Sequence, residues 1–248
     1  MIQRLKAIYR DQAFFPGILG IFVNPFYLAR AGLSRAMGEM AKSLHGQLLD
    51  VGCGTKPYRR LFAVDSYKGL DIDSEVTRAH GVADYYYDGG RFPITDASFD
   101  SALCNQVLEH VFNPDDFLAE ISRVLKPGGQ LLLTIPFVWD EHEQPYDYAR
   151  YSSFGLTALL ERAGFEIVEH RKLGDDASIL FQLANAYLYK ITARLPPLLR
   201  LLIATPLRTA INILGLLARW TLPKNPDLFL DHVVLARKFR DDEGHPRG

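Results

Sequence analysis

The sequence predicts an α/β fold, with a doubly wound, mostly parallel seven-stranded sheet. Short apolar runs alternate with amphipathic helical patterns over residues 46–172, which is typical of a parallel sheet whose crossover helices cover both faces. Glycines follow the first apolar run at once, and polar residues follow the ends of the others. An open parallel sheet binds its ligand at that edge. We also expect an N-terminal helical segment, and a C-terminal helical insertion before the last strand.

Composition narrows the class of protein. The chain has 248 residues, of which 48% are hydrophobic, so a folded chain with one main core is expected. Its 28 basic and 29 acidic side chains nearly cancel, so we expect no nucleic-acid partner. The cysteines, Cys53 and Cys104, lack zinc-site spacing and are too few for a disulfide framework. We therefore expect a reducing, cytoplasmic setting and no metal.

The secondary structure follows from periodicity and from helix-end signals. Residues 28–44 read as an amphipathic helix, and Asn113-Pro114 begins a second helix with an N-cap residue and an N1 proline. A third helix is expected over residues 152–163. The apolar stretch 13–29 is interrupted by two prolines and an asparagine, so we read no signal peptide there. The expected strands are 48–51, 67–72, 82–87, 99–105, 130–136, 165–171 and 230–236.

These elements predict four segments. They are an N-terminal helical and apolar segment at 1–45, a ligand-binding core at 46–175, a helical insertion at 176–224, and the last strand with a polar tail at 225–248.

The insertion has a composition unlike the rest of the chain. Residues 190–224 contain six basic side chains and no acidic one, amid many leucines, and Arg200, Arg208 and Arg219 have no acid near them in the sequence. We expect two helices parted at Pro196-Pro197, with Pro206 breaking the second pattern, so a membrane-spanning helix is not expected. Contact with an anionic membrane surface through 190–224 is one interpretation. A helical cap over the site and a homodimer contact are the others.

The residues around the glycine turn indicate the kind of ligand. Gly52 and Gly54 follow the first strand, but Pro57 stands where a dinucleotide site has a third glycine. Asp50 precedes the turn, where a carboxylate disfavours a pyrophosphate but attracts an ammonium or sulfonium group. S-adenosylmethionine carries both. Acids after the second and third strands can accept hydrogen bonds from ribose hydroxyls and from an adenine amino group.

At this point the sequence resembles the class I S-adenosylmethionine-dependent methyltransferases, most closely the broad group that includes quinone-biosynthesis methyltransferases. The motifs are Leu48-Leu-Asp-Val-Gly-Cys-Gly-Thr55, Gly69-Leu-Asp-Ile-Asp73, the series from Asp88 to Asp100, Val107-Leu-Glu-His110 and Arg123-Val-Leu-Lys-Pro-Gly-Gly129. The resemblance implies a Rossmann-like methyltransferase fold and S-adenosyl-L-methionine as cofactor, with S-adenosyl-L-homocysteine as product. The cofactor-binding residues that it implies are Asp50, Gly52, Cys53, Gly54, Asp71, Ile72, Asp88, Asn105 and Gln106.

Some positions depart from the group's pattern or admit a structural role. Lys56 stands where the group often has a glycine, so it is expected to reshape the turn. Asp73 and Asp84 are interpreted as solvated neighbours of Asp71 and Asp88. Cys53 is expected to be a small buried apolar residue that borders the site.

The segment from His142 to Tyr151 is the candidate acceptor site. It holds a histidine, an arginine, acids and tyrosines in ten positions, which is poor core material. We assign catalytic candidates to His142, Glu143 and Tyr146, with His142 as a general base oriented by Glu143 or Asp147. Alternatively the segment is a lid, fixed by an ion pair between Asp147 and Arg150. The segment resembles the run that follows the fifth strand in methyltransferases found among bacterial cell-surface polysaccharide enzymes, which implies a sugar or lipid-linked acceptor.

Two functions remain in competition. The first is an S-adenosylmethionine-dependent methyltransferase (EC 2.1.1.-), cytoplasmic or at the inner face of the membrane, acting on a small-molecule, glycan or lipid-linked acceptor. The second is a non-catalytic protein of the same fold, docked to a membrane or a partner enzyme.

Overall fold

The structure is a computed structural model that describes residues 2–240, with side chains from Ala7 onward. It divides into two compact units, each described by itself. The first, here called the helical unit, comprises residues up to Ala36, Val138–Asp140 and Lys172–Asp231. The second, called the sheet unit, comprises Met37–Phe137, Glu141–Arg171 and the chain from His232 on.

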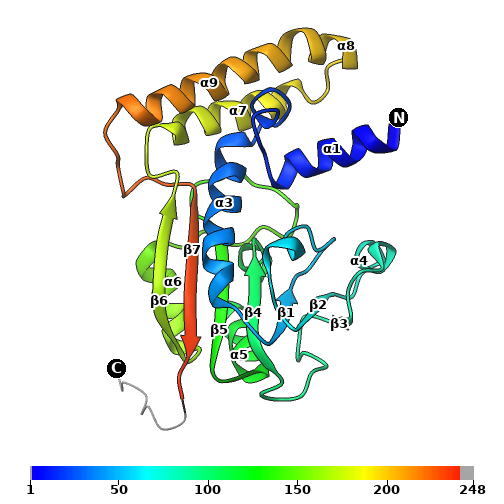
Figure 1. Cartoon of the computed structure of the whole chain (residues 1–248), viewed down its shortest axis with the longest axis vertical. Helices are drawn as coiled ribbons and strands as arrows, with labels where there is room; N and C mark the ends of the chain where they lie inside the picture. The colour runs from blue at the N-terminus through cyan, green and yellow to red at the C-terminus, as the bar shows by residue number, and fades with distance from the viewer. Residues whose placement is uncertain (1, 241–248) are drawn as a thin grey trace. The chain divides into compact units, whose positions relative to one another are not determined.

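The sheet has seven strands, as predicted. They are β1 (Gln47–Val51), β2 (Ser66–Ile72), β3 (Tyr85–Tyr87), β4 (Phe99–Asn105), β5 (Leu125–Pro136), β6 (Phe165–Leu173) and β7 (Asp231–Lys238). Their order is β3-β2-β1-β4-β5-β7-β6. The pairs β1–β2, β1–β4, β2–β3 and β4–β5 are parallel. The arrow of β7 points opposite to that of β6 (Figure 1), so the sheet is mixed.

The order of the strands shows where on the sheet a ligand is expected to bind. From β1 the chain moves outward through β2 to β3, and then returns to the other side of β1 as β4. The carboxyl ends of β1 and β4 therefore flank the point where strand order reverses, which is where open α/β sheets bind ligands. The register pairs Asp50 with Gly69 and with Leu103, so Asp50 lies between these two neighbours.

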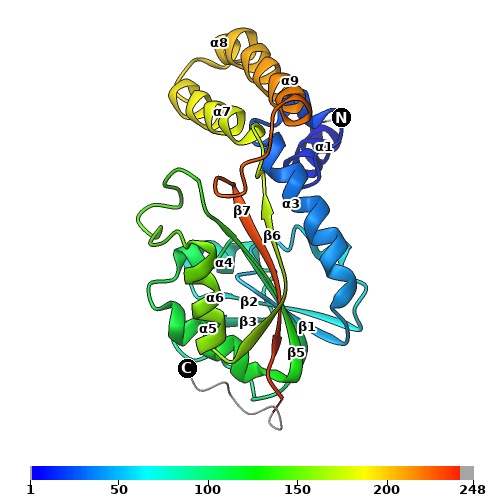
Figure 2. The ribbon, with the colours of Figure 1, turned by 90° about the vertical axis from the view of Figure 1, so that its left-hand side faces the viewer.

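Short helices complete the sheet unit. They include η1 (Ala41–Ser43), η2 (Arg59–Leu61), α4 (Glu75–His80), η3 (Leu108–His110), α5 (Pro114–Val124) and α6 (Ser153–Arg162). Figure 2 shows α5 and α6 on one face of the sheet, where Leu118, Ile121 and Leu160 are fully buried in the core. Helix α5 begins at Pro114 and α6 is capped by Ser152, whose hydroxyl accepts from the Gly155 N–H at 3.2 Å. Both starts confirm the sequence expectation.

Two strands begin several residues away from their predicted first residues. β5 begins at Leu125, earlier than the predicted residue 130, because Lys-Pro-Gly-Gly ends the helix and already continues in strand conformation. β3 is shorter than predicted and begins only at Tyr85. The preceding Asp84 instead turns its carboxylate toward β2, where it accepts from the Gly69 N–H at 2.8 Å.

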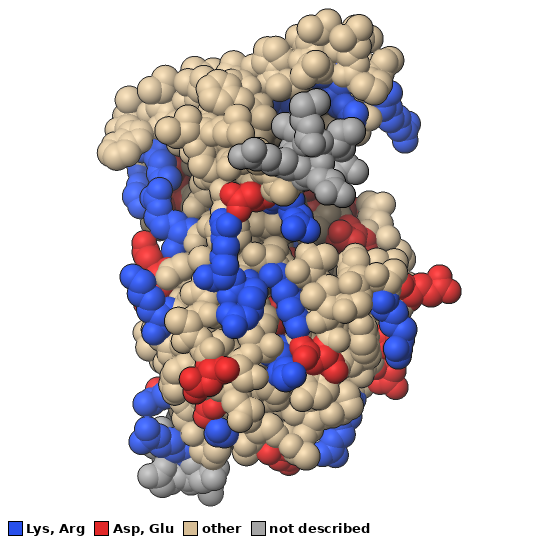
Figure 3. Space-filling view, turned by 45° about the vertical axis from the view of Figure 1, so that its right-hand side comes forward, with Lys and Arg blue, Asp and Glu red and all other residues tan. Residues whose placement is uncertain are grey.

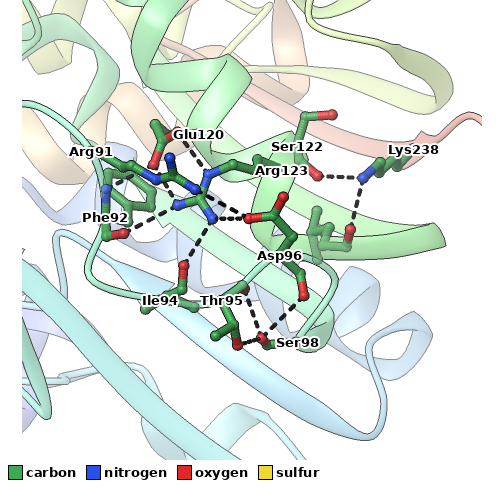
Figure 4. A network of polar contacts seen from close by, with 11 residues as sticks. Arg91, Phe92, Ile94, Thr95, Asp96, Ser98, Glu120, Ser122, Arg123 and Lys238 are labelled. Atoms are coloured by element: carbon green, nitrogen blue, oxygen red, sulfur yellow. Dashed lines mark hydrogen bonds and ion pairs between the residues drawn. The ribbon is translucent and has the colours of Figure 1, made fainter.

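Arg123 fixes the loop that follows β3 (Figure 4). Its guanidinium donates to the carboxylates of Glu120 and Asp96, and to the backbone oxygens of Phe92 and Ile94, over distances of 2.6–3.1 Å. Contact with these two acids raises the pKa of Arg123, and the pKa values of Glu120 and Asp96 are lowered by their hydrogen bonds to it. The loop is thereby tied to α5 from both its backbone and its side chains.

The helical unit contains α1 (Ile2–Phe14), α2 (Gly20–Val23), most of α3 (Tyr27–Met40), α7 (Ser178–Thr192) and a final long helix. That helix runs through α8 (Pro197–Leu199), the π-helical turn η4 (Arg200–Ala204) and α9 (Thr205–Thr221). The expected break at Pro206 is therefore wrong. Proline lacks an N–H, but here the π-turn before it absorbs the mismatch, and Pro206 stands in the first turn of α9. The helix is long and apolar enough to cross a membrane, judged by length and composition only.

Candidate functional site

The glycine turn after β1 is held against the ends of β2 and β4. Gly52 has a φ of 72°, and a Cβ there would lie 2.4 Å from Cγ2 of Val107, so both its conformation and its space require glycine. The N–H groups of Gly52 and Cys53 both donate to the Leu70 carbonyl, at 2.8 and 3.1 Å. The turn is therefore fixed beside the last residues of β2.

Asp71 is oriented by the same turn. One carboxylate oxygen accepts from the Gly54 N–H at 2.8 Å, and the other accepts from the Ile72 N–H at 2.9 Å. The Cys53 thiol lies 3.8 Å from Asp71. Each carboxylate oxygen can accept more than one hydrogen bond, so Asp71 is held in place while it keeps capacity for a ligand's hydroxyl groups.

Asp50 is buried on β1, and its environment disfavours charge. Burial raises its pKa to about 7, against the partly offsetting effects of the Tyr67 hydroxyl and the Lys56 ammonium. The Tyr67 hydroxyl donates to Asp50 over 2.6 Å. A carboxylate that is costly to ionise alone will ionise more readily beside a cationic ligand. Tyr67 was not singled out from the sequence, although it shares the β2 face of Asp71 by the two-residue period of a strand.

Lys56 and Asp84 take roles that the sequence did not predict. Lys56 adopts a φ of 53°, and its ammonium pairs with Asp84 at 2.7 Å. Lys68 also donates to Asp84, at 3.0 Å. Asp84 is exposed, as expected of a solvated neighbour, and it also anchors Lys56 and β2. Asp73 is exposed and pairs with Arg78, as a solvated neighbour would.

The remaining predicted cofactor residues end the neighbouring strands. Asp88 follows β3, is exposed, and accepts from the Gly90 N–H at 3.1 Å. Ile72 ends β2 with its side chain 40% exposed, which is unusual for an isoleucine at a strand end. Asn105 ends β4 and accepts from the Thr134 hydroxyl at 2.8 Å. Gln106 follows with a φ of 55° and donates its backbone N–H to the Thr134 carbonyl.

Both cysteines are buried and free, as expected. Burial raises the pKa of the Cys53 thiol to about 12, and that of Cys104 well above its usual value. Neither is a thiolate near neutral pH, so neither is an activated nucleophile.

In the acceptor segment His142 lies beside Asp147. Asp147, and not Glu143, is therefore the acid placed to orient the His142 ring. His142 Nδ1 lies 3.3 Å from an Asp147 carboxylate oxygen, and the backbone N–H of His142 donates to the same oxygen at 3.0 Å. Hydrogen bonds from Arg150 lower the pKa of Asp147 to about 2, so this acid is ionised. Glu143 is exposed and its carbonyl accepts from the Tyr146 N–H, so the expected orienting role of Glu143 is not seen.

Tyr146 and Arg150 each make a polar contact that helps to fix the acceptor segment. The Tyr146 side chain is 61% exposed, while its carbonyl oxygen lies 2.7 Å from His110 Nδ1. Arg150 binds the Asp147 carboxylate with both terminal nitrogens, at 2.5 and 2.8 Å. The ion pair of the lid interpretation is thus present together with an oriented His142.

A buried carboxylate joins the segment to the end of β4. Glu109 lies in η3 and has no exposed surface, and its Oε1 lies 3.7 Å from His110 Nε2 and 3.9 Å from His142 Nε2. The two imidazole rings meet edge to face, with centroids 4.8 Å apart. The sequence placed Glu109 and His110 in a familiar motif, but could not show that they meet His142.

This cluster has the chemistry of a proton relay. His110 Nδ1 lies beside the Tyr146 carbonyl, and His142 Nδ1 lies beside both the Asp147 carboxylate and Arg150 Nη2, the latter at 3.4 Å, while Nε2 of each ring faces Glu109. Burial lowers the pKa of His110 and so favours its neutral form. Glu109, His110 and His142 also place one ligand atom each within 4.8 Å of one another. Their carboxylate and imidazole groups are of the types that could hold a metal ion.

Comparison with known proteins identifies the fold family. A methyltransferase-domain family profile matches residues 49–133. A probable S-adenosylmethionine-dependent methyltransferase of Mycolicibacterium smegmatis is 34% identical over 134 residues, which cover 48% of this chain and 52% of that protein. The chain thus spans about half the length of this relative.

Solved structures agree on the fold. A Haemonchus contortus phosphoethanolamine N-methyltransferase bound to S-adenosyl-L-methionine has a TM-score of 0.55 at 17% identity, covering 95% of this chain and 57% of that one. The [4+2]-cyclase SpnF has a TM-score of 0.54 at 24% identity, covering 84% and 81%. At such identities the likeness shows the fold alone. Together, the profile match, the relative and the order of the motifs make the core of this chain similar to class I S-adenosylmethionine-dependent methyltransferase domains.

Proposed function

We propose that this chain transfers the methyl group of S-adenosylmethionine to an acceptor held beside Glu109, His110 and His142. The observation that carries the proposal is the state of Asp71. Its carboxylate is fixed by the backbone of the glycine turn, at the end of β2, while its hydrogen-bonding capacity is not exhausted. Asp71 is proposed to bind the ribose hydroxyls, and Asp50 to lie near the positive methionine part of the donor.

The other predicted cofactor residues complete that donor site. Ile72 and Asp88 are proposed to border the adenosine, since they end β2 and follow β3. Gly52, Cys53 and Gly54 are proposed to line the methionine part, with Asn105 and Gln106 beside it at the end of β4.

Methyl transfer itself needs little from the protein beyond position. An acceptor atom attacks the methyl carbon in line with the breaking carbon–sulfur bond, and S-adenosylhomocysteine leaves. Where the acceptor must lose a proton, His142 Nε2 is proposed to take it, because Asp147 faces the opposite ring nitrogen and stabilises the imidazolium. Tyr146, exposed beside it, is proposed to form a wall of the acceptor site.

The acceptor class is proposed to be a small molecule, a glycan or a lipid-linked molecule. Transfer of labelled methyl from S-adenosylmethionine to fractionated lipid and glycan extracts tests this proposal. Labelled product that depends on His142 supports it. A protein that binds S-adenosylhomocysteine but labels no fraction would favour the non-catalytic alternative, while binding of NADH instead would contradict the donor assignment.

We also propose cytoplasmic localisation with contact to an anionic membrane through residues 190–224. Lys190, Arg194, Arg200, Arg219 and Lys224 supply positive charge in a stretch without acids. The expectation that no acid lies near the arginines is wrong for Arg219, which pairs with Asp176 at 3.2 Å. Asp140 and Asp175 likewise pair with Lys190 and Lys224. Charge alone is therefore a weaker attraction than the sequence suggests, and apolar surface must contribute.

A further inference from the structure

The helical unit buries several amide side chains and exposes many leucines, which is unusual for a water-soluble bundle. Three amide side chains of α7 and α9 are buried: Gln182 and Asn185 have no exposed surface, and Asn212 is 1% exposed. Soluble proteins place apolar residues inside and amides outside. Here the amides are inside, and the leucines of the long helix point outward.

The buried amides form a connected network. Asn185 donates to the Asn212 side-chain oxygen at 2.8 Å, and Asn212 donates to the Ile21 and Asn24 carbonyls at 2.9 and 3.1 Å. Gln182 accepts from the Ala29 N–H, and donates to the Pro25 carbonyl, each at 3.1 Å. These bonds tie α7, α9 and the N-terminal segment together, beside a small set of buried apolar residues that includes Leu33, Ile179 and Ala186.

Small residues complete the contact. Gly215 and Ala218 lie on the buried face of α9, and a Cβ on Gly215 would come within 2.7 Å of Leu28 and 2.9 Å of Phe181. Close approach at small residues and hydrogen bonds between amides are how helices pack in lipid, where leucine gains nothing by turning inward.

The outward face of the long helix is correspondingly apolar. Leu201, Leu202, Leu217 and Trp220 are 61%, 63%, 57% and 85% exposed. Only 22% of the most apolar window of Pro197–Thr221 is buried. The uppermost surface in Figure 3, where α7 and α9 lie, is almost entirely free of charged side chains on the face shown. A patch of this kind marks an interaction site on a soluble protein.

The positions of the basic side chains indicate what binds this apolar surface and how deeply the long helix would enter it. No acidic residue occurs from Ala177 to Pro226, and although Asp140, Asp176 and Asp175 pair with Lys190, Arg219 and Lys224, they leave Arg194 and Arg200 to face an anionic surface. Arg200, Arg208 and Arg219 recur along the helix, and Arg208 lies eight residues, about 12 Å, beyond Arg200. Such spacing would place Arg208 at hydrocarbon depth if the helix spanned a bilayer, whereas a helix lying in the interface keeps all three near the headgroups.

We infer that the apolar faces of α7 and α9 insert into the acyl boundary of one leaflet of an anionic membrane, with the long helix lying in the membrane plane. This deepens the proposed membrane contact, and it does not depend on methyl transfer. It also assigns the buried amides a purpose, since their hydrogen bonds still hold the helices together in lipid, where apolar side chains gain little by turning inward.

Vesicle flotation of the full chain tests the contact. Wild type is expected to float with phosphatidylcholine vesicles that contain phosphatidylserine, and less with phosphatidylcholine alone. Leu201→Asn, Leu202→Asn and Leu217→Asn together should reduce the floated fraction at least tenfold. Arg194→Glu with Arg200→Glu should remove the preference for anionic vesicles.

A matched control separates this surface from general loss of exposed apolar residues. Val76, Phe154 and Val168 are 65%, 88% and 52% exposed in the sheet unit, and their replacement by asparagine should leave flotation unchanged. Binding of S-adenosylhomocysteine without lipid is measured for every variant, so a misfolded sheet unit is detected and the donor assignment is judged separately. Wild type that stays at the bottom with both vesicles overturns the inference, and a dimer that the leucine variant dissociates would identify a protein contact instead.

The fluorescence of Trp220 reports how deeply α9 enters the membrane. In a Trp139→Phe background its emission should shift to the blue on adding anionic vesicles, and lipids brominated near the headgroup end of the chain should quench it more than lipids brominated near the methyl end. Flotation without a shift would show attachment by headgroups only, and strongest quenching at the methyl end would show a helix deeper than the interface. Either result overturns insertion at the acyl boundary.

Discussion

Replacing Asp50 by asparagine should stabilise the ligand-free protein at high pH while impairing donor binding. Asp50 is buried, and burial raises its pKa from 3.8 to about 7. Between these values the folded state binds the proton that the unfolded chain releases, so the free energy of unfolding falls as pH rises through this window. Below it both states are protonated, and above it the full cost of the buried carboxylate is present.

The magnitude follows from the same shift. The folded pKa lies about two units above pH 5, and each unit corresponds to about 1.4 kcal/mol. From pH 5 to pH 8 the wild type should therefore lose about 3 kcal/mol relative to Asp50→Asn, which cannot ionise. The Tyr67 hydroxyl, now 2.6 Å from Asp50, can still donate to the asparagine oxygen, so its hydrogen bond is kept.

Urea unfolding of wild type and Asp50→Asn at pH 5, 6, 7 and 8, followed by circular dichroism, measures this difference. A gap that stays constant within about 0.5 kcal/mol over the series would refute the account of a carboxylate held uncharged by burial. Calorimetry with S-adenosylmethionine provides the functional counterpart, because a cationic ligand should bind more tightly as Asp50 ionises and should lose affinity in the variant.

Three further predictions test other parts of the sheet unit. His142→Ala should lower turnover about 10²–10⁴-fold with donor affinity near wild type, measured by labelled methyl transfer; a loss under about threefold would leave the segment as a lid. Arg123→Ala should lower the free energy of unfolding at pH 7 by about 2–3 kcal/mol, since it removes charged hydrogen bonds to Glu120 and to the loop after β3. That loss should shrink as pH falls below about 4, because Glu120 then becomes protonated and its ion pair with Arg123 no longer stabilises the folded state. Urea unfolding of wild type and variant at pH 7 and at a pH below about 4 measures the difference. Gly52→Ala should cost about 1–3 kcal/mol of stability and weaken S-adenosylhomocysteine, because of its positive φ and its contact with Val107; unchanged calorimetric affinity would show that the turn does not shape the donor site.

The number of strands and the residues at their carboxyl ends could be predicted because each has a local signature. The run ending at Val51 is apolar and is followed by glycine, and Asp71 follows another such run, so the shared edge comes from parallel topology alone. Helix starts at Pro114 and Ser152 were equally local.

Contacts between distant segments could not be predicted. Nothing near Asp84 in the sequence indicates that Lys56, 28 residues earlier, pairs with it. Glu109 meets His142 only because the chain after β5 returns to η3, where the Tyr148 N–H donates to the Glu109 carbonyl at 2.8 Å. The choice of Asp147 over Glu143 depends on the turn within that segment, which composition does not specify.

The most direct test of the central claim, that the donor binds at the acidic edge of the sheet, is calorimetric titration of S-adenosylhomocysteine into wild type, Asp71→Ala and Asp73→Ala. Asp73 is a matched control two residues away, exposed and paired with Arg78. Wild type and Asp73→Ala should bind one equivalent with similar affinity, and folded Asp71→Ala should lose about 1.5–3 kcal/mol, because the ribose hydroxyls lose a charged acceptor. Undiminished affinity in folded Asp71→Ala, or no binding by wild type, would contradict the account.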